Sequence, residues 1–141
     1  MSAASLIYPM FAMVLITVFV LVALFRRRMH AVRGGEVSSR YFRIYQGAAE
    51  PESAAKAARH FSNLFEAPVL FYVACLAAMV LRLDGLLPVV LAWLYVLTRG
   101  VHALVHLGSN RLRHRIAIYG ISWLVLLALW IVIAVAVAMR A

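Results

Sequence analysis

The sequence has too few cysteines for any cysteine-based framework. Its single cysteine, Cys75, lies within an apolar run of a 141-residue chain. One cysteine can form neither an intrachain disulfide framework nor a cysteine-rich metal site. We therefore expect Cys75 to be a small, buried apolar residue.

Charged residues are also scarce. They make up 13% of the chain, whereas 66% of the residues are hydrophobic and the mean hydropathy is +0.94. Soluble domains carry far more polar residues, and this length suits one domain. The composition predicts an all-α membrane protein that forms a single domain over residues 1–141 and has the lipid bilayer as its surroundings.

Four apolar runs are each long enough to cross about 30 Å of hydrocarbon at about 1.5 Å per residue. They lie at about 6–25, 64–83, 86–107 and 116–139. With their polar extensions they predict a four-transmembrane-helix bundle with helices at about 5–28, 52–83, 86–108 and 113–139. The first run lacks a basic start and a small-residue cleavage site, so we interpret it as a retained helix.

Two prolines mark features of the second helix. Pro51 stands between two glutamates, which is typical of a helix start. Pro68 lies within the helix and cannot donate a backbone hydrogen bond to the carbonyl of Leu64. The sequence therefore predicts a kink there.

The basic residues gather in two of the three loops. The first loop region holds eight (Arg26, Arg27, Arg28, Arg33, Arg40, Arg43, Lys56 and Arg59), and the last loop holds Arg111, Arg113 and Arg115. The positive-inside rule predicts that both loops are cytoplasmic and both termini outside. Although the net charge is +9, a basic patch for phosphates needs a soluble face, so we expect no nucleic-acid partner.

Polar side chains recur at helical spacing within the predicted spans. They are Arg59, Asn63 and Glu66 on the second helix; Tyr95, Arg99, His102, His106 and Asn110 on the third; and Arg115, Tyr119 and Ser122 on the fourth. Ionisable residues within membrane spans are functional hypotheses by default. Because the three stripes meet at the cytoplasmic level, they predict a cation-rich pocket open to the cytoplasm.

Simpler interpretations of these residues stay open. Arg59 and Arg115 are also typical of arginines that snorkel to the interface. Glu66 and Arg99 suit a structural ion pair. The histidines of the third helix suit hydrogen-bonded interior positions.

The histidine pair gives little support for a metal site. His102 and His106 have the spacing of helical metal ligands, but Ala103 stands where a zincin has its glutamate. A third ligand would have to be Glu66. We therefore expect no metal cofactor.

At these residues the sequence resembles the MAPEG family, the membrane-associated proteins of eicosanoid and glutathione metabolism. The resemblance covers nearly the whole chain. Arg59-x-x-x-Asn63-x-x-Glu66, followed by Pro68, is similar to the glutathione-binding signature of that family. Arg99-x-x-His102 followed by Arg115 is similar to the prostaglandin E synthase branch. The chain departs from the family pattern at His106, where a tyrosine is expected, and at Ala67, where some members have an aromatic residue.

The resemblance implies a homotrimer that binds glutathione as cosubstrate in a cytoplasm-facing cleft between neighbouring protomers. By position, Arg115 matches the catalytic arginine that stabilises the thiolate. The implied glutathione-binding residues are Arg26, Arg59, Asn63, Glu66, Arg99, His102, His106, Arg111 and Tyr119. A thiol with a pKa of about 8.5 is a weak nucleophile until it ionises, and an adjacent guanidinium favours the thiolate.

The leading hypothesis is a glutathione-dependent membrane transferase or peroxidase that acts on lipophilic electrophiles. The alternative is a non-catalytic subunit of the same fold, or a lipid- or anion-binding protein. A proton or ion pathway is a third possibility, which the purely apolar outer halves of the helices weaken. The arginine and alanine bias of the sequence suggests a bacterial inner membrane.

Overall fold

A computed structural model describes residues 2–45 and 50–140 of the chain, and these residues form helices without a strand. The elements are η1 (Ala3–Leu6), α1 (Ile7–Arg33), α2 (Tyr41–Ile44), α3 (Glu52–Asn63), α4 (Ala67–Val80), α5 (Leu86–Leu107) and α6 (Leu112–Ala138). Four helical stretches, with η1 joined to α1 and α3 joined to α4, are long and apolar enough to cross a membrane. The predicted four-helix membrane bundle is confirmed.

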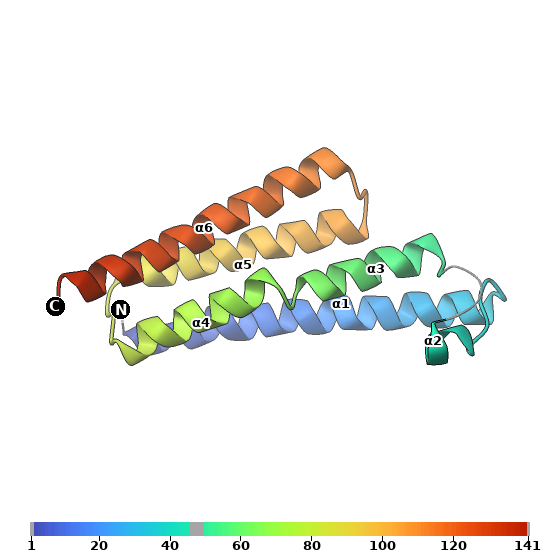
Figure 1. Ribbon diagram of the computed structural model, residues 1–141, viewed down its shortest axis with the longest axis horizontal. Coiled ribbons are helices and arrows are strands. Elements are labelled where there is room, and N and C mark those ends of the chain that lie inside the picture. The colour runs from blue at the N-terminus through green and yellow to red at the C-terminus, as the bar shows by residue number, and fades with distance from the viewer. Residues whose placement is uncertain (1, 46–49, 141) are drawn as a thin grey trace.

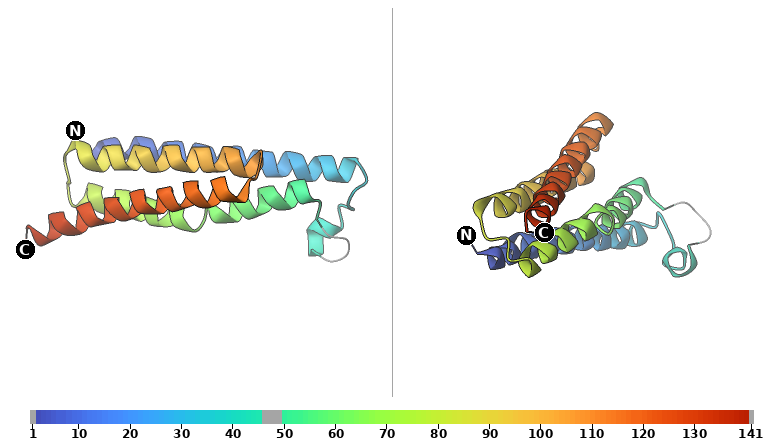
Figure 2. Two further views of the ribbon diagram at one scale, coloured as in Figure 1. Left: turned by 90° about the horizontal axis from the view of Figure 1, so that it is seen from above. Right: turned by 60° about the vertical axis from the view of Figure 1, so that its left-hand side comes forward.

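The bundle is elongated, and its two ends differ in character (Figure 1). Both termini lie at the same end as the α4–α5 turn, whereas the α5–α6 turn, the end of α1 and helix α2 lie toward the other end. Helix α5 is central, because it packs against α6, α1 and α3. In the right-hand view of Figure 2, α6 is inclined to α1 and α3 and diverges from them toward the α5–α6 turn.

The second membrane-crossing stretch is divided rather than merely kinked. Helix α3 ends at Asn63, and α4 begins at Ala67 with Pro68 in its first turn. Between them Glu66 has φ −100° and ψ −101°, which is not helical. The predicted distortion at Pro68 is confirmed, and it amounts to a complete break. A proline ring removes one hydrogen bond and crowds the preceding turn, which accounts for the break.

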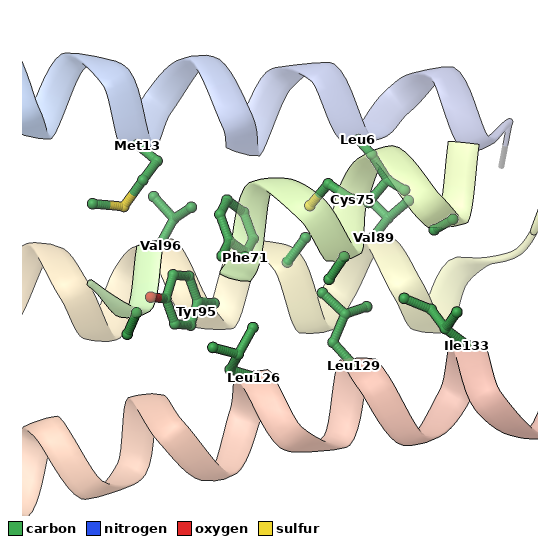
Figure 3. Close-up of a cluster of buried hydrophobic side chains, with 14 of the residues drawn as sticks. Leu6, Met13, Phe71, Cys75, Val89, Tyr95, Val96, Leu126, Leu129 and Ile133 are labelled. Atoms are coloured by element: carbon green, nitrogen blue, oxygen red, sulfur yellow. The ribbon is translucent and has the colours of Figure 1, made fainter. Parts of the chain in front are cut away.

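The end of the bundle near the termini is filled by apolar side chains (Figure 3). Phe71 of α4 stacks on Tyr95 of α5 with ring centroids 4.5 Å apart. Cys75 is fully buried within the same cluster, as predicted. Large apolar side chains such as Phe11, Leu76 and Leu124 are exposed on the outside of the helices. Such an apolar exterior suits contact with lipid.

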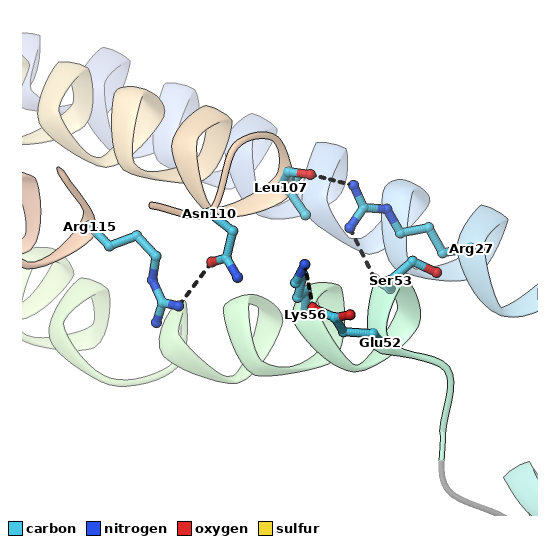
Figure 4. Close-up of polar contacts among 7 residues, drawn as sticks. All are labelled: Arg27, Glu52, Ser53, Lys56, Leu107, Asn110 and Arg115. Atoms are coloured by element: carbon cyan, nitrogen blue, oxygen red, sulfur yellow. Dashed lines mark hydrogen bonds and ion pairs between the residues drawn. The ribbon is translucent and has the colours of Figure 1, made fainter. Parts of the chain in front are cut away.

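The other end of the bundle is held by an arginine of α1. The Nη1 atom of Arg27 donates to the carbonyl of Ser53 at 3.0 Å, and its Nη2 donates to the carbonyl of Leu107 at 2.6 Å (Figure 4). The Leu107 carbonyl belongs to the last turn of α5, where backbone carbonyls have no hydrogen-bond donor within the helix. Arg27 therefore ties α1 to the start of α3 and the end of α5.

We predict that Arg27→Gln lowers the free energy of unfolding by about 1–3 kcal/mol, because it removes hydrogen bonds from a charged donor. Thermal unfolding in detergent, followed by circular dichroism, measures the loss. Arg33→Gln on the same helix is the control, because Arg33 is exposed. Equal unfolding temperatures for the two variants would contradict this role of Arg27.

Candidate functional site

A polar pocket lies where three helices meet near the α5–α6 turn. Its volume is about 230 Å³. It is lined by Asn63 from α3, His102 from α5, and Leu112, Arg115, Ile116 and Tyr119 from α6. Each of the three polar stripes of the sequence contributes at least one lining residue. Separate helices therefore converge on one pocket within the single chain, as the polar stripes predicted.

Arg115 stands in the first turn of α6 and is held by the turn before that helix. Its Nη1 atom donates to Oδ1 of Asn110 at 2.9 Å (Figure 4). Asn110 has φ +49°, a left-handed conformation that asparagine tolerates better than most residues. Because the partner is a neutral amide, the positive charge of Arg115 is not neutralised by this contact.

Arg99 is completely buried, and it acts at the break between α3 and α4. Its Nη2 atom donates to the backbone carbonyl of Asn63 at 3.3 Å. In a continuous helix the N–H of Ala67 would bond to this carbonyl. The Arg99 guanidinium also lies 5.6 Å from the ring centroid of Tyr119. Arg99 therefore contacts both Asn63 of α3 and Tyr119 of α6, two of the residues that line the pocket.

Arg99 is not paired with Glu66 in this arrangement. Within residues 2–45 and 50–140, the side-chain ion pairs are Arg28–Glu50 and Glu52–Lys56. Glu66 is exposed at the α3–α4 break. The alternative of a structural Glu66–Arg99 ion pair is therefore wrong for the described chain.

A third histidine, His60 of α3, joins the two that the sequence singled out. Its ring centroid lies 5.2 Å from that of His102 and 4.8 Å from that of His106. All three rings are at least 98% buried. Sequence reasoning missed His60, although it shares the three-residue spacing of the buried Ala54 and Ala57 and so lies on the inward face of α3.

Six of the predicted site residues do not line this pocket. Arg99 and His106 are buried, whereas Arg26, Arg59, Glu66 and Arg111 are exposed. Arg26 instead lines a groove on α1 together with Phe25, Met29, His30, Arg33 and Gly34. The chain thus brings together part of the predicted set, namely Asn63, His102, Arg115 and Tyr119 in the pocket lining, with the buried Arg99 and His106 nearby.

The pocket does not offer the ligands of a metal centre. Among the described residues, no group of three His, Cys, Asp or Glu side chains is placed to hold a metal ion. The cations near the pocket are guanidinium groups, which would repel a metal ion. Its chemistry is therefore that of hydrogen-bond donors and positive charge, which suits an anionic ligand.

Comparison of the sequence with known protein families identifies one match. Residues 6–135 match the MAPEG family. No match was found among curated proteins or among solved structures. The matched region contains all four membrane-crossing stretches nearly complete, and it includes every residue that lines the pocket. The chain is therefore an integral membrane protein that belongs to the MAPEG family of glutathione and eicosanoid metabolism.

Proposed function

We propose that the protein is a glutathione-dependent membrane enzyme that transfers the thiol to a lipophilic electrophile or reduces a lipid peroxide. The observation that carries this proposal is the pocket itself. It places Arg115, His102, Asn63 and Tyr119 together within an otherwise apolar bundle. Membership of the MAPEG family supports glutathione as the ligand.

The charge of the pocket suits a thiolate. Arg115 contacts the neutral Asn110 and Arg99 contacts a backbone carbonyl, so neither of these contacts cancels a positive charge. A guanidinium beside a thiol favours its ionised form, and each pKa unit corresponds to about 1.4 kcal/mol. We assign thiolate stabilisation to Arg115, because it lines the pocket whereas Arg99 lies behind it.

Four of the residues that the sequence predicts to bind glutathione are exposed, which suits a ligand shared between protomers. Glutathione carries two carboxylates and one ammonium group, which arginines and one glutamate can bind. Arg26, Arg59, Arg111 and Glu66 are exposed on the protomer. We propose that in a homotrimer these side chains bind the ends of a glutathione whose sulfur lies at Arg115. Arg26 would come from a neighbouring protomer, because it lines a separate groove.

The second substrate would enter from the lipid. Leu112 and Ile116 line the pocket beside Arg115, and both are exposed. An apolar rim next to the thiolate lets a lipophilic electrophile reach the sulfur without crossing water. We further propose that the basic loops face the cytoplasm of a bacterial inner membrane, where glutathione is available to the pocket.

A non-catalytic lipid-binding protein is the second candidate. The same apolar rim beside an unneutralised arginine also suits an anionic phospholipid, with acyl chains at Ile116 and the phosphate at Arg115. Binding measurements in detergent with glutathione and with a short-chain phosphatidylglycerol separate the two functions. A protein that binds only the phospholipid is not the proposed enzyme.

We predict that Arg115→Ala lowers the rate of thioether formation by about 10- to 100-fold, the range expected when a hydrogen bond to a charged group is lost. The reaction of glutathione with an aromatic electrophile, followed by absorbance, measures it. The control is Arg113→Gln on the same helix, where Arg113 is exposed and outside the pocket. Failure of the wild-type protein to bind millimolar glutathione would refute the proposed function.

We predict that two inactive variants restore each other when they are mixed in one oligomer. In an oligomer of Arg26→Gln and Arg115→Ala protomers, some interfaces combine an intact Arg26 with an intact Arg115. Co-expression with two different affinity tags, tandem purification and the same thioether assay test this. Activity no higher than that of the separate variants would contradict a site shared between protomers.

We predict opposite accessibility for the two ends of the bundle. In a Cys75→Ala background, Ser2→Cys should react with a membrane-impermeant maleimide on spheroplasts, and Ser109→Cys should react only after permeabilisation. Both serines are exposed, and they lie before η1 and in the α5–α6 turn. The reverse labelling pattern would contradict the proposed orientation.

A further inference from the structure

Polar nitrogens without partners lie directly behind the pocket. Five buried ring nitrogens have no hydrogen-bond partner among the described residues: both nitrogens of His60, both of His106, and Nδ1 of His102. Buried polar groups in proteins are almost always hydrogen-bonded, and the exceptions call for an explanation. A cluster of three such rings in a membrane span points to a function rather than to packing.

His102 connects this cluster to the pocket. It lines the pocket together with Arg115 and Tyr119, and its ring centroid lies 5.6 Å from that of Tyr119. On its other side it lies 5.2 Å from His60 and 5.7 Å from His106, again between ring centroids. Because its buried, unpartnered nitrogen is Nδ1, Nε2 is the nitrogen available to the pocket.

The other polar lining residues cannot take a proton from a thiol. The Asn63 amide is not a base, and the arginine guanidinium stays protonated. The Tyr119 hydroxyl is a weak acid rather than a base in its neutral form. Imidazole is the side chain that exchanges protons near neutral pH. Of the polar groups that line the pocket, His102 alone can therefore serve as the base.

We propose that His102 is the base that accepts the thiol proton of the bound cosubstrate, and that His60 and His106 position it. This inference rests on the proposed glutathione function. In the step, the S–H bond breaks and both electrons stay on sulfur, which becomes the thiolate beside Arg115. The proton passes to Nε2 of His102, which becomes an imidazolium, and it leaves later to solvent or to the leaving group.

His60 and His106 have the chemistry to orient this base. A neutral imidazole can accept at Nε2 only if its hydrogen is on Nδ1, and the partner of the other nitrogen decides which tautomer forms. Each neutral imidazole of His60 and His106 has one acceptor nitrogen. Through a single bridging water, one of them can accept the hydrogen of His102 Nδ1. The pair thereby holds the reactive tautomer and, after transfer, stabilises the imidazolium.

The neighbouring charges distinguish this role from metal binding. The guanidinium of Arg99 lies 5.6 Å from the ring centroid of the lining residue Tyr119, and Arg115 lines the pocket. No described group of three His, Cys, Asp or Glu side chains is placed around a common metal position. A proton acceptor that returns its proton quickly suits such cationic surroundings better than a divalent cation does.

The test separates glutathione binding from thiolate formation in the purified full-length protein. Isothermal titration calorimetry gives the Kd of glutathione. Stopped-flow ultraviolet absorbance with a pH indicator gives the rates of thiolate formation and proton release. For His102→Gln we expect a Kd within about threefold of wild type, since one of several ligand contacts changes, and both rates slower by about 10²-fold.

Two further variants exclude a merely structural effect. In His102→Ala, imidazole added to the buffer should restore the rate of proton release, which a structural defect would not allow. His60→Phe keeps an aromatic ring at the same position but removes both nitrogens, and we expect it to slow proton release while the Kd stays unchanged. His114→Gln is the matched control, because His114 is exposed on α6.

Each failure has a distinct meaning. A wild-type protein that binds no glutathione refutes the proposed function. Wild-type rates of thiolate formation in His102→Gln, with glutathione bound, overturn the assignment of the base and leave the proposed function intact. Unchanged proton release in His60→Phe overturns the positioning role. Stoichiometric binding of Zn²⁺ that His60→Phe abolishes would overturn the inference in favour of a metal site.

Discussion

The structure depends on the hydrogen bond that Arg99 donates to the backbone carbonyl of Asn63. Pro68 breaks the second membrane-crossing helix, and a broken helix inside a bilayer leaves backbone groups that lipid cannot satisfy. Arg99 brings a buried donor from α5 to that break. The interaction joins α3 to α5, and with the Tyr119 contact it reaches α6. The three helices that line the pocket are therefore connected through one guanidinium.

The need to satisfy backbone groups inside the bilayer also explains why the polar residues do not spread along the whole bundle. Stacked Phe71 and Tyr95 and the apolar cluster around them fill the end near the termini. The rest of the bundle contains the α3–α4 break, near its middle, and beyond it the α5–α6 turn and the Arg27 contacts, where backbone carbonyls require donors. Arg99 donates to the backbone at the break, and Arg115, which donates to Asn110, supplies the positive charge to which the proposed thiolate stabilisation is assigned. Stability and the proposed chemistry therefore depend on neighbouring arginines.

Much of this could be predicted because the spacing of polar residues is regular. Arg99 and His102 of α5 and Arg115 and Tyr119 of α6 repeat at three- or four-residue intervals, which places each set on one helix face. His60 was missed, because its neighbour Arg59 carries the recognisable motif and because His60 shares its spacing with two alanines, which mark no polar stripe. The partner of Arg99 was also missed, because a backbone carbonyl leaves no trace in the sequence.

By itself the sequence determined the number of membrane-crossing helices, the presence of a distortion just before Pro68 and the level at which polar residues gather. Hydrophobic length, proline geometry and helical period are local properties, so they can be read along the chain. Only the tertiary structure decided that Arg99 serves the backbone, that Glu66 is exposed, and that His60 joins the pair on α5. Those outcomes depend on the rotation of packed helices about their axes, which contacts between distant residues determine.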